Sequence, residues 1–213
     1  YEITYGDWSS DVCSSDLPRM LGLYMWQAAE ALDCLNARQH IRNGKRVGFQ
    51  HGDIKPNNIL LVGETAKLTD YGLSITTYGP QTPCPRSGTL DYAAPEVFKG
   101  YLTDTSDQYS FAVSYCVLRG IGFPFPKISP EDIRGSFHRP PPDLSLLPLA
   151  EQVALKRSLS HVPQDRYPGC REMMLAILKS RGLKVTRDAN GLPMIVDDED
   201  SSFDVISTDI LPT

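Results

Sequence analysis

The sequence lacks the cysteine spacing of a disulfide framework. Its 213 residues contain five cysteines, and none of them stands in a C-x-x-C pair. Small secreted domains are dense in paired cysteines, whereas the proteins of reducing compartments keep their thiols free. We therefore interpret the five as free thiols and expect a cytoplasmic protein.

Long hydrophobic runs and an excess of positive charge are also missing. The longest apolar stretch, residues 111–125, is interrupted by Arg119, Gly120 and Gly122, so we expect no membrane-spanning segment in this chain. No signal-peptide pattern is visible. The net charge of −5 disfavours nucleic acid as a partner. The 41% of hydrophobic residues is enough for one domain with a core of its own.

Residues 1–17 have neither a helical nor a strand period. The decamer WSSDVCSSDL at residues 8–17 is what one obtains by translating a common sequencing-adapter end, TGG AGT TCA GAC GTG TGC TCT TCC GAT CT. We interpret it as an assembly artefact, with an ordinary polar loop as the alternative. Residues 1–17 are then non-native or a hinge remnant, and the domain proper begins at residue 18.

The stretch HGDIKPNNILLVGETAKLTDYG at residues 51–72 organises the rest of the chain. Two apolar runs, residues 59–62 and 66–68, are joined across a Gly-Glu pair, which predicts a small β-hairpin. A polar loop precedes the hairpin and a carboxylate follows it. Pairing the two strands would bring the ends of this stretch together.

Four polar side chains would meet around that hairpin. Asn58 and Asp70 offer oxygen atoms, the ligands that Mg²⁺ prefers together with substrate phosphates. Lys55 can neutralise a phosphoryl group in transfer. Asp53 remains to orient a hydroxyl nucleophile or to take its proton.

Three motifs in order carry a family resemblance. HGDIKPNN at residues 51–58, DYG at 70–72 and APE at 94–96 resemble the catalytic loop, the metal-binding triplet and the end of the activation segment of eukaryotic-type (bacterial-like) serine/threonine protein kinases. One such motif is a weak signal, but three in order are strong. The resemblance covers residues 18–182. It implies an α+β fold, namely a mainly helical C-terminal lobe with a small β-hairpin at the catalytic site.

The resemblance also implies the reaction and the residues that perform it. The reaction would be Mg²⁺- and ATP-dependent phosphoryl transfer to a protein substrate. Asp53 would act on the acceptor hydroxyl, and Lys55 would lie against the γ-phosphate. Thr89 would bond to the side chains of Asp53 and Lys55. Asn58 and Asp70 would hold Mg²⁺ and, with Lys55, the nucleotide. The residues with structural roles would be His51, Gly72, Glu96, Asp107 and Arg166.

Two of these structural roles are contacts that a structure can test. Asp107 would hold the backbone of the catalytic loop from behind; without the resemblance it would be a first-turn carboxylate favoured by the helix dipole. Arg166 would pair with Glu96; without the resemblance it would be a surface residue.

Periodicity and composition predict the remaining elements. Apolar spacing predicts helices over residues 18–35, 105–118, 149–159 and 170–178. We expect a solvated basic loop over residues 36–50, with a docking patch as the minority alternative, and a loop over residues 70–96. Residues 183–213 hold two cations against seven acids, which predicts a mostly disordered acidic tail.

Two departures from the family pattern bear on activity. Gly52 replaces the arginine that usually precedes the catalytic aspartate and meets a phosphate on the activation segment, so we expect activity that such a phosphate does not switch. The chain also has no Gly-rich loop and no strand lysine for the α- and β-phosphates. Those belong to an N-terminal lobe that we expect to be missing here, which would leave this chain poorly active.

Two other functions stay open. A pseudokinase scaffold usually loses one of Asp53, Asn58 and Asp70, and all three are present. Small-molecule phosphotransferases of the aminoglycoside or choline type share the HGD and P-x-N elements but generally lack the Lys-Pro arrangement and the APE end. Lys55, two residues after the aspartate, favours serine or threonine over tyrosine as the acceptor.

Overall fold

The computed structural model describes residues 17–85, 87–127 and 139–199. Residues 8–16 of the adapter-like decamer, and the hinge remnant expected over residues 1–7, lie outside these ranges. The last residue of the decamer, Leu17, is the first residue of helix α1.

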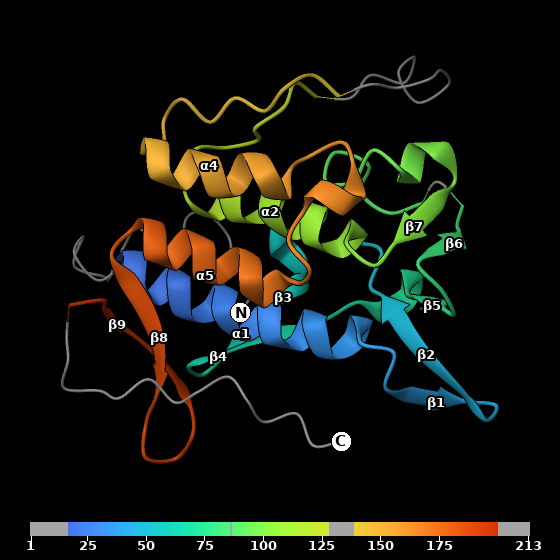
Figure 1. Cartoon of the computed structure of the whole chain (residues 1–213), viewed down its shortest axis with the longest axis horizontal. Helices are drawn as coiled ribbons and strands as arrows, with labels where there is room; N and C mark the ends of the chain where they lie inside the picture. The colour runs from blue at the N-terminus through green and yellow to red at the C-terminus, as the bar shows by residue number, and fades with distance from the viewer. Residues whose placement is uncertain (1–16, 86, 128–138, 200–213) are drawn as a thin grey trace.

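Within the described residues, four α-helices form the body of the molecule (Figure 1). They are α1 (Leu17–Asn36), α2 (Ser106–Leu118), α4 (Leu149–Ser158) and α5 (Cys170–Ser180). Helix α5 packs on α1 and on α4, and α4 packs on α2. The main hydrophobic core therefore lies between the four helices, and all four lie within two residues of the predicted ranges at each end.

The helices differ in how they bury their surfaces. In α1 the predicted apolar stripe faces the core, with Leu21, Met25 and Leu32 almost completely buried. Helix α2 is buried nearly all round, including Asp107 and Gln108 at its start. A helix that is buried on every side can hold neighbouring segments on several faces at once, and α2 does so for the catalytic loop.

The predicted hairpin is present. Strands β3 (Ile59–Val62) and β4 (Thr65–Leu68) pair antiparallel, with Ile59 opposite Leu68. Ile59 and Leu68 are buried, and the hairpin lies against α1. Its open end therefore holds the residues just before Ile59 and just after Leu68 side by side.

The prediction of a loop over residues 36–50 is wrong, although residues 41–46 are exposed to solvent as expected. Strands β1 (His40–Arg42) and β2 (Lys45–Gln50) form a hairpin, and β2 also pairs with β5 (Ile75–Thr77). The turn residues Asn43 and Gly44 both have positive φ, as tight hairpin turns require.

Two arginines of this segment bond inside the molecule. Arg38 donates to both carboxylate oxygens of Asp104, at 2.6 and 2.8 Å, and Arg42 donates to Thr76 at 2.5 Å. The cluster of basic residues suggested solvent, but strand pairing and these contacts hold the segment in place.

The prediction of a disordered tail from residue 183 is wrong for its first part. Strands β8 (Leu183–Arg187) and β9 (Pro193–Asp197) pair antiparallel along their whole length and lie beside α1 and α5 (Figure 1). Leu183 and Val196 are buried. Two ion pairs join the hairpin to α1: Asp197 pairs with Arg19 of α1, and Arg187 pairs with Glu30 of α1. Burial and these long-range pairs outweigh the acidic composition; residues 200–213 lie outside the described ranges.

Replacing Val196 with alanine tests the β8–β9 hairpin. Val196 is 8% exposed, so losing two methyl groups should lower the free energy of unfolding by about 1–2 kcal/mol. Leu192, which is 61% exposed in the turn, is the matched control, and Leu192→Ala should change stability by less than about 0.5 kcal/mol. Urea unfolding measures both. Equal, negligible effects would mean that the hairpin does not pack on the helices.

The remaining strand pair joins two parts of the chain that lie far apart in sequence. β6 (Gln81–Pro83) pairs with β7 (Tyr101–Thr103). Short antiparallel pairs beside a helical core make the fold class α+β, as predicted. Among the described residues, no helix is long and apolar enough to cross a membrane.

Candidate active site

The loop between β2 and β3 brings Asp53 and Lys55 together with Thr89. The Lys55 ammonium donates to Asp53 Oδ2 at 2.8 Å and to Thr89 Oγ1 at 2.9 Å. The Thr89 amide donates to Asp53 Oδ1 at 2.7 Å. Each carboxylate oxygen thus has its own donor, and the contacts expected for Thr89 are present.

These donors set the charge state of Asp53. Burial raises the pKa of its carboxyl group, but hydrogen bonds from Lys55 and from the Thr89 amide and hydroxyl outweigh burial and hold the pKa below its ordinary value. Asp53 is therefore an anion at neutral pH, beside a cation, and is able to align a hydroxyl group.

Asn58 precedes the β3–β4 hairpin and Asp70 follows it, so both lie at its open end. The Asn58 amide nitrogen donates to the Asp53 carbonyl oxygen at 2.7 Å and to Asp53 Oδ2 at 3.1 Å. Because the nitrogen faces Asp53, the Asn58 side-chain oxygen is left for a cation. The Thr69 amide donates to the Asn58 carbonyl oxygen at 3.0 Å, which places the next residue, Asp70, at the same end of the hairpin.

The backbone at Asp70 turns sharply. Its φ of 62° lies in the left-handed region, which aspartate tolerates better than most residues, and its side chain is exposed. Within the described ranges, no group of three or more His, Cys, Asp and Glu side chains could hold a metal by itself. Asn58 and Asp70 therefore fit Mg²⁺ as a partial oxygen site that phosphate oxygens complete.

Asp107 holds the loop from behind. Its two carboxylate oxygens accept the backbone amides of His51 at 2.6 Å and of Gly52 at 3.0 Å. Burial raises the pKa of Asp107, and these amide donors lower it by a smaller amount. The predicted contact is present, and it holds the backbone of the two residues that directly precede Asp53.

His51 contacts the residues around the DYG triplet. Its Nε2 lies 2.9 Å from the Thr69 carbonyl oxygen, and its ring lies 5.0 Å from the Tyr71 ring, centroid to centroid. The imidazole is buried, and its Nδ1 accepts the Asp53 amide at 3.4 Å, contacts that are consistent with a structural role. Gly72 follows directly in a short 3₁₀ turn (Tyr71–Leu73).

Sequence reasoning missed Gln50. Its side chain is completely buried, accepts the Asp107 amide at 3.1 Å and donates to the Asp104 carbonyl oxygen at 3.4 Å. Gln50 thus ties the start of α2 to the strand that leads into the catalytic loop. Its position directly before the HGD motif was the only signal.

Glu96 and Arg166 form the predicted ion pair, and it is buried. Arg166 donates from Nη1 and Nη2 to the two oxygens of Glu96, both at 2.8 Å. Ser106 donates to the same carboxylate at 2.6 Å. The Arg166 guanidinium also lies 4.9 Å from the centre of the Tyr109 ring. The pair ties the end of the activation segment to the C-terminal part of the fold.

This ion pair predicts a loss of stability in acid. Burial raises the pKa of Glu96, but bonds from Arg166 and Ser106 outweigh it and lower the pKa in the folded state. A lowered folded pKa adds stability above the unfolded pKa of about 4.3, and this stability is lost as pH falls through the folded value. Thermal unfolding of the wild type and of Glu96→Gln, followed from pH 7 to 3, measures it. The difference in unfolding temperature between the wild type and Glu96→Gln should become smaller below about pH 4. A difference that stays constant with pH would contradict the lowered pKa of Glu96.

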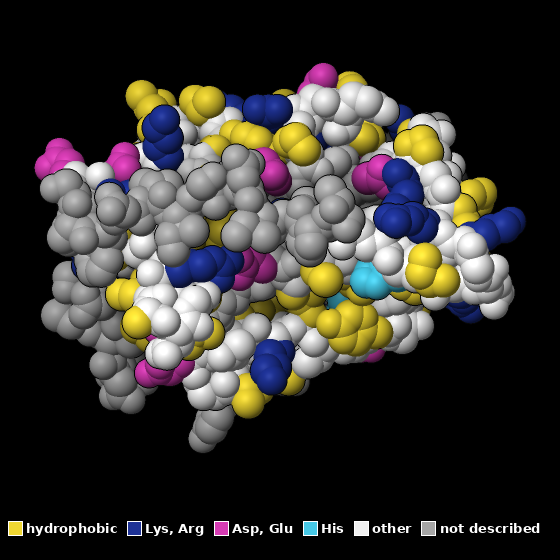
Figure 2. All heavy atoms as spheres, turned by 60° about the horizontal axis from the view of Figure 1, so that its bottom comes forward, with side chains coloured by type: hydrophobic (Ala, Val, Ile, Leu, Met, Phe, Trp, Pro, Cys, Tyr) yellow, Lys and Arg dark blue, Asp and Glu magenta, His cyan; other side chains and the backbone are white. Residues whose placement is uncertain are grey.

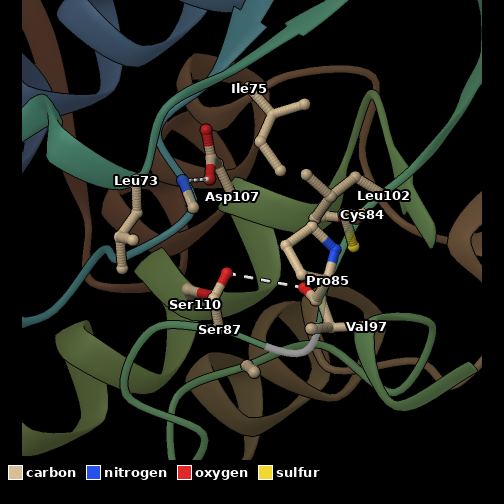
Figure 3. A pocket seen from close by; sticks show the side chains of 12 residues that line it. Leu73, Ile75, Cys84, Pro85, Ser87, Val97, Leu102, Asp107 and Ser110 are labelled. Carbon is tan, nitrogen blue, oxygen red and sulfur yellow. Dashed lines mark hydrogen bonds between the residues drawn. The ribbon is translucent and has the colours of Figure 1, made fainter. Parts of the chain in front are cut away.

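Gly52 borders a small cavity beneath the activation segment. The cavity holds about 20 Å³, room for about one water molecule. Figure 3 shows Leu73, Ile75 and Cys84 on its walls and Asp107 behind it. No side chain from position 52 fills this space. The arginine that the family usually carries there would project from the same point of the loop.

Restoring a side chain at position 52 should destabilise the fold. Gly52 has φ +80°, and a Cβ atom there would lie 2.9 Å from the Leu73 carbonyl oxygen. Gly52→Ala should therefore cost about 2–3 kcal/mol, from left-handed strain and this contact together. Gly63 is the matched control because its φ is +62° with no atom within 4 Å, so Gly63→Ala should cost only about 1–2 kcal/mol. Denaturant titration compares them; equal costs would rule out the close contact.

The first half of the activation segment is held by strand pairing. β5 pairs with β2, and β6 pairs with β7. Among the hydroxyls of this segment, Thr77 is buried, Thr76 accepts a bond from Arg42, and Ser87 donates to the Pro85 carbonyl oxygen at 3.4 Å. Strand pairing thus holds residues 75–77 and 81–83, and the Glu96–Arg166 ion pair holds the end of the segment.

The structure thus combines a helical body, a small β-hairpin and the three motifs at residues 51–58, 70–72 and 94–96. The family model described as the protein kinase domain matches residues 17–178. The chain belongs to the protein kinase domain family.

Several curated proteins are similar to this chain. The serine/threonine-protein kinase PknK of Mycobacterium bovis is 38% identical over 57% of the chain, a match that covers 12% of that protein. A probable serine/threonine-protein kinase of Encephalitozoon cuniculi is 36% identical over 48% of the chain and 19% of its own length. An Aurora kinase of Eremothecium gossypii is 36% identical over 36% of the chain and 18% of its own length. The chain thus matches a fifth or less of each of these relatives.

Proposed function

We propose that this chain is the C-terminal lobe of a serine/threonine protein kinase that transfers the γ-phosphoryl group of Mg-ATP to hydroxyls of a protein substrate. The observation that carries the proposal is the Asp53–Lys55–Thr89 cluster, in which the Lys55 ammonium lies 2.8 Å from the buried Asp53 carboxylate and 2.9 Å from the Thr89 hydroxyl, and the Thr89 amide lies 2.7 Å from the same carboxylate. Catalysis of phosphoryl transfer rests on positioning and charge neutralisation.

Each residue of the cluster has a defined part in that reaction. Asp53 accepts the hydrogen bond of the acceptor hydroxyl and aligns it for attack. Lys55 places positive charge beside the transferred group, where negative charge develops. Thr89 holds both side chains from the activation segment. Asn58 and Asp70 offer oxygens to Mg²⁺, which when bound neutralises phosphate charge.

The nucleotide side of the site is open in this chain. Val62, Tyr71 and Leu73 are large apolar side chains near the hairpin, and each is more than a third exposed. We propose that an N-terminal lobe covers them and binds the α- and β-phosphates, so that the isolated chain transfers phosphate slowly. The four described cysteines are free, which favours a reducing, cytoplasmic compartment.

A binding scaffold is the second candidate. The exposed apolar face and the lack of a Gly-rich loop favour it for the chain as it stands. On the face drawn in Figure 2, cationic and anionic side chains are scattered rather than gathered into one charged patch, so a protein partner suits that face better than nucleic acid. A small-molecule phosphotransferase is less favoured because Glu96 and Arg166 are paired as in protein kinases.

The test combines binding and transfer. The chain is mixed with Mg-ATP, and its unfolding temperature is measured, since a ligand that binds only the folded state raises it. Labelled γ-phosphate transfer is then followed to a mixture of serine-, threonine- and tyrosine-containing proteins and to an aminoglycoside, offered side by side. Label on serine or threonine supports the proposal. Label on the aminoglycoside overturns it, and neither shift nor label favours the scaffold.

A further inference from the structure

A buried arginine lies beneath the segment that carries Thr89. Arg139 is 1% exposed although it stands beside three consecutive prolines in the sequence. Its Nη2 donates to the backbone carbonyl oxygens of Leu90 at 2.7 Å, Asp91 at 2.7 Å and Ala93 at 3.1 Å. One guanidinium therefore binds the carbonyl groups of two overlapping turns. In the first turn the Tyr92 amide donates to the Thr89 carbonyl oxygen, and in the second the Ala93 amide donates to the Leu90 carbonyl oxygen.

Aromatic rings and carbonyl oxygens surround the Arg139 guanidinium and restrict its movement. Its guanidinium lies 4.9 Å from the centre of the Phe125 ring, 5.8 Å from that of Phe98 and 5.9 Å from that of Tyr109. Ring faces and carbonyl oxygens both favour a buried positive charge. Burial lowers the pKa of the Arg139 guanidinium, and electrostatic interaction with Tyr109 and Asp91 acts against this. Packing on three sides leaves the guanidinium few alternative orientations.

The turns that Arg139 holds begin at the catalytic cluster. Thr89 directly precedes Leu90, and its amide and hydroxyl bond to Asp53 and Lys55. On the other side, a Cβ atom at Gly88 would lie 2.6 Å from the Gly52 carbonyl oxygen, so the segment passes very close to the catalytic loop. Small shifts in residues 90–93 would therefore move Thr89 off Asp53.

Two buried arginines thus flank Tyr109 and hold consecutive parts of one segment. Arg166 holds its end through Glu96, as the family resemblance predicts. We propose that Arg139 is a positioning residue that fixes residues 90–93 from beneath and so keeps Thr89 on Asp53 and Lys55, where the acceptor hydroxyl is to bind. The proposal rests on the proposed function for its catalytic meaning, but its structural part can be tested without activity.

Three variants of the full chain separate positioning from general stability. Arg139→Met removes the donors and keeps the length of the side chain. Arg139→Lys keeps a charge and donors but loses the planar fork. Leu155→Ala, in the core on α4, is the matched control. It should lower the free energy of unfolding by about 2–5 kcal/mol, and it removes no hydrogen bond to the carbonyl groups that Arg139 binds.

The main readout is amide hydrogen exchange at single-residue resolution, at Thr89, Tyr92 and Ala93. In Arg139→Met these amides should exchange about tenfold faster or more, beyond any change in α1 and α2, because the opening is local. Arg139→Lys should restore most of the protection. Leu155→Ala should speed exchange without preference for these three. The proposal is overturned if Arg139→Met leaves the three unchanged relative to α1 and α2, or if Leu155→Ala gives the same local pattern.

A kinetic readout links this opening to substrate. Arg139→Met should lower kcat/KM for the acceptor protein by about tenfold, with the KM for ATP unchanged, since the turns lie on the acceptor side. A rise in the KM for ATP alone would contradict the proposal. If the wild-type chain transfers no phosphate, the proposed function fails, while the exchange data still decide whether Arg139 positions Thr89.

Discussion

Replacing Arg166 with methionine is expected to lower the free energy of unfolding by about 3–5 kcal/mol, because the change strands the Glu96 carboxylate in the core. Both side chains are at most 1% exposed. Glu96 would keep its bonds from Ser106 and Thr103, but two neutral donors do not replace a bidentate cation. Urea unfolding followed by circular dichroism measures the loss.

Two further variants sharpen this test. In Arg38→Met the lost ion pair, with Asp104, has side chains 36% and 43% exposed, so the cost should be about 0–1 kcal/mol. The double variant Glu96→Gln/Arg166→Met should cost clearly less than the sum of its two single changes, because no charge is left stranded. Additive costs would show that the two side chains do not act as a pair.

Replacing Asp53 with asparagine is expected to slow phosphoryl transfer to protein serine or threonine by about 10²–10⁴-fold. The amide keeps the shape of the side chain but loses the charge that aligns the acceptor hydroxyl and attracts Lys55. Single-turnover transfer of labelled phosphate at high protein concentration measures the rate even where turnover is slow.

The binding of Mg-ATP separates the roles of the two aspartates. Asp53→Asn should preserve most of the rise in unfolding temperature with Mg-ATP, whereas Asp70→Asn should remove most of it, since Asp70 is proposed to hold the metal. Asp198→Asn, on the exposed end of the β8–β9 hairpin, is the control and should change neither rate nor binding. A wild-type transfer rate in Asp53→Asn would refute the assignment of the acceptor side.

Local patterns predicted much of the fold because their causes lie within a few residues. The apolar stripe of α1 predicts the helix to within one residue at each end, and the β3–β4 hairpin forms where two apolar runs flank a Gly-Glu pair. Pairing of these strands also places Asn58 and Asp70 at one end of the hairpin. The contacts of Asp107 and Arg166 were predictable only through the motifs, since their partners lie 55 to 70 residues away.

Predictions from composition were wrong where long-range contacts determine the local structure. The acids of residues 183–199 suggested disorder, yet Asp197 bonds to Arg19 across 178 residues. The basic residues of the segment before the catalytic loop suggested solvent, yet β2 pairs with β5. In both cases backbone pairing and buried apolar side chains outweigh a charge pattern that is read one residue at a time.

The sequence by itself determined the family and the order of its three motifs, and with them the candidate residues Asp53, Lys55, Asn58 and Asp70, because these depend on short spacings along the chain. Only the tertiary structure decided the left-handed backbone at Gly52 and the place of Arg139, whose carbonyl partners lie 46 to 49 residues earlier. A buried cation beneath a backbone turn leaves no pattern in neighbouring residues. It becomes visible only when the folded chain brings the carbonyl groups and the aromatic rings around it.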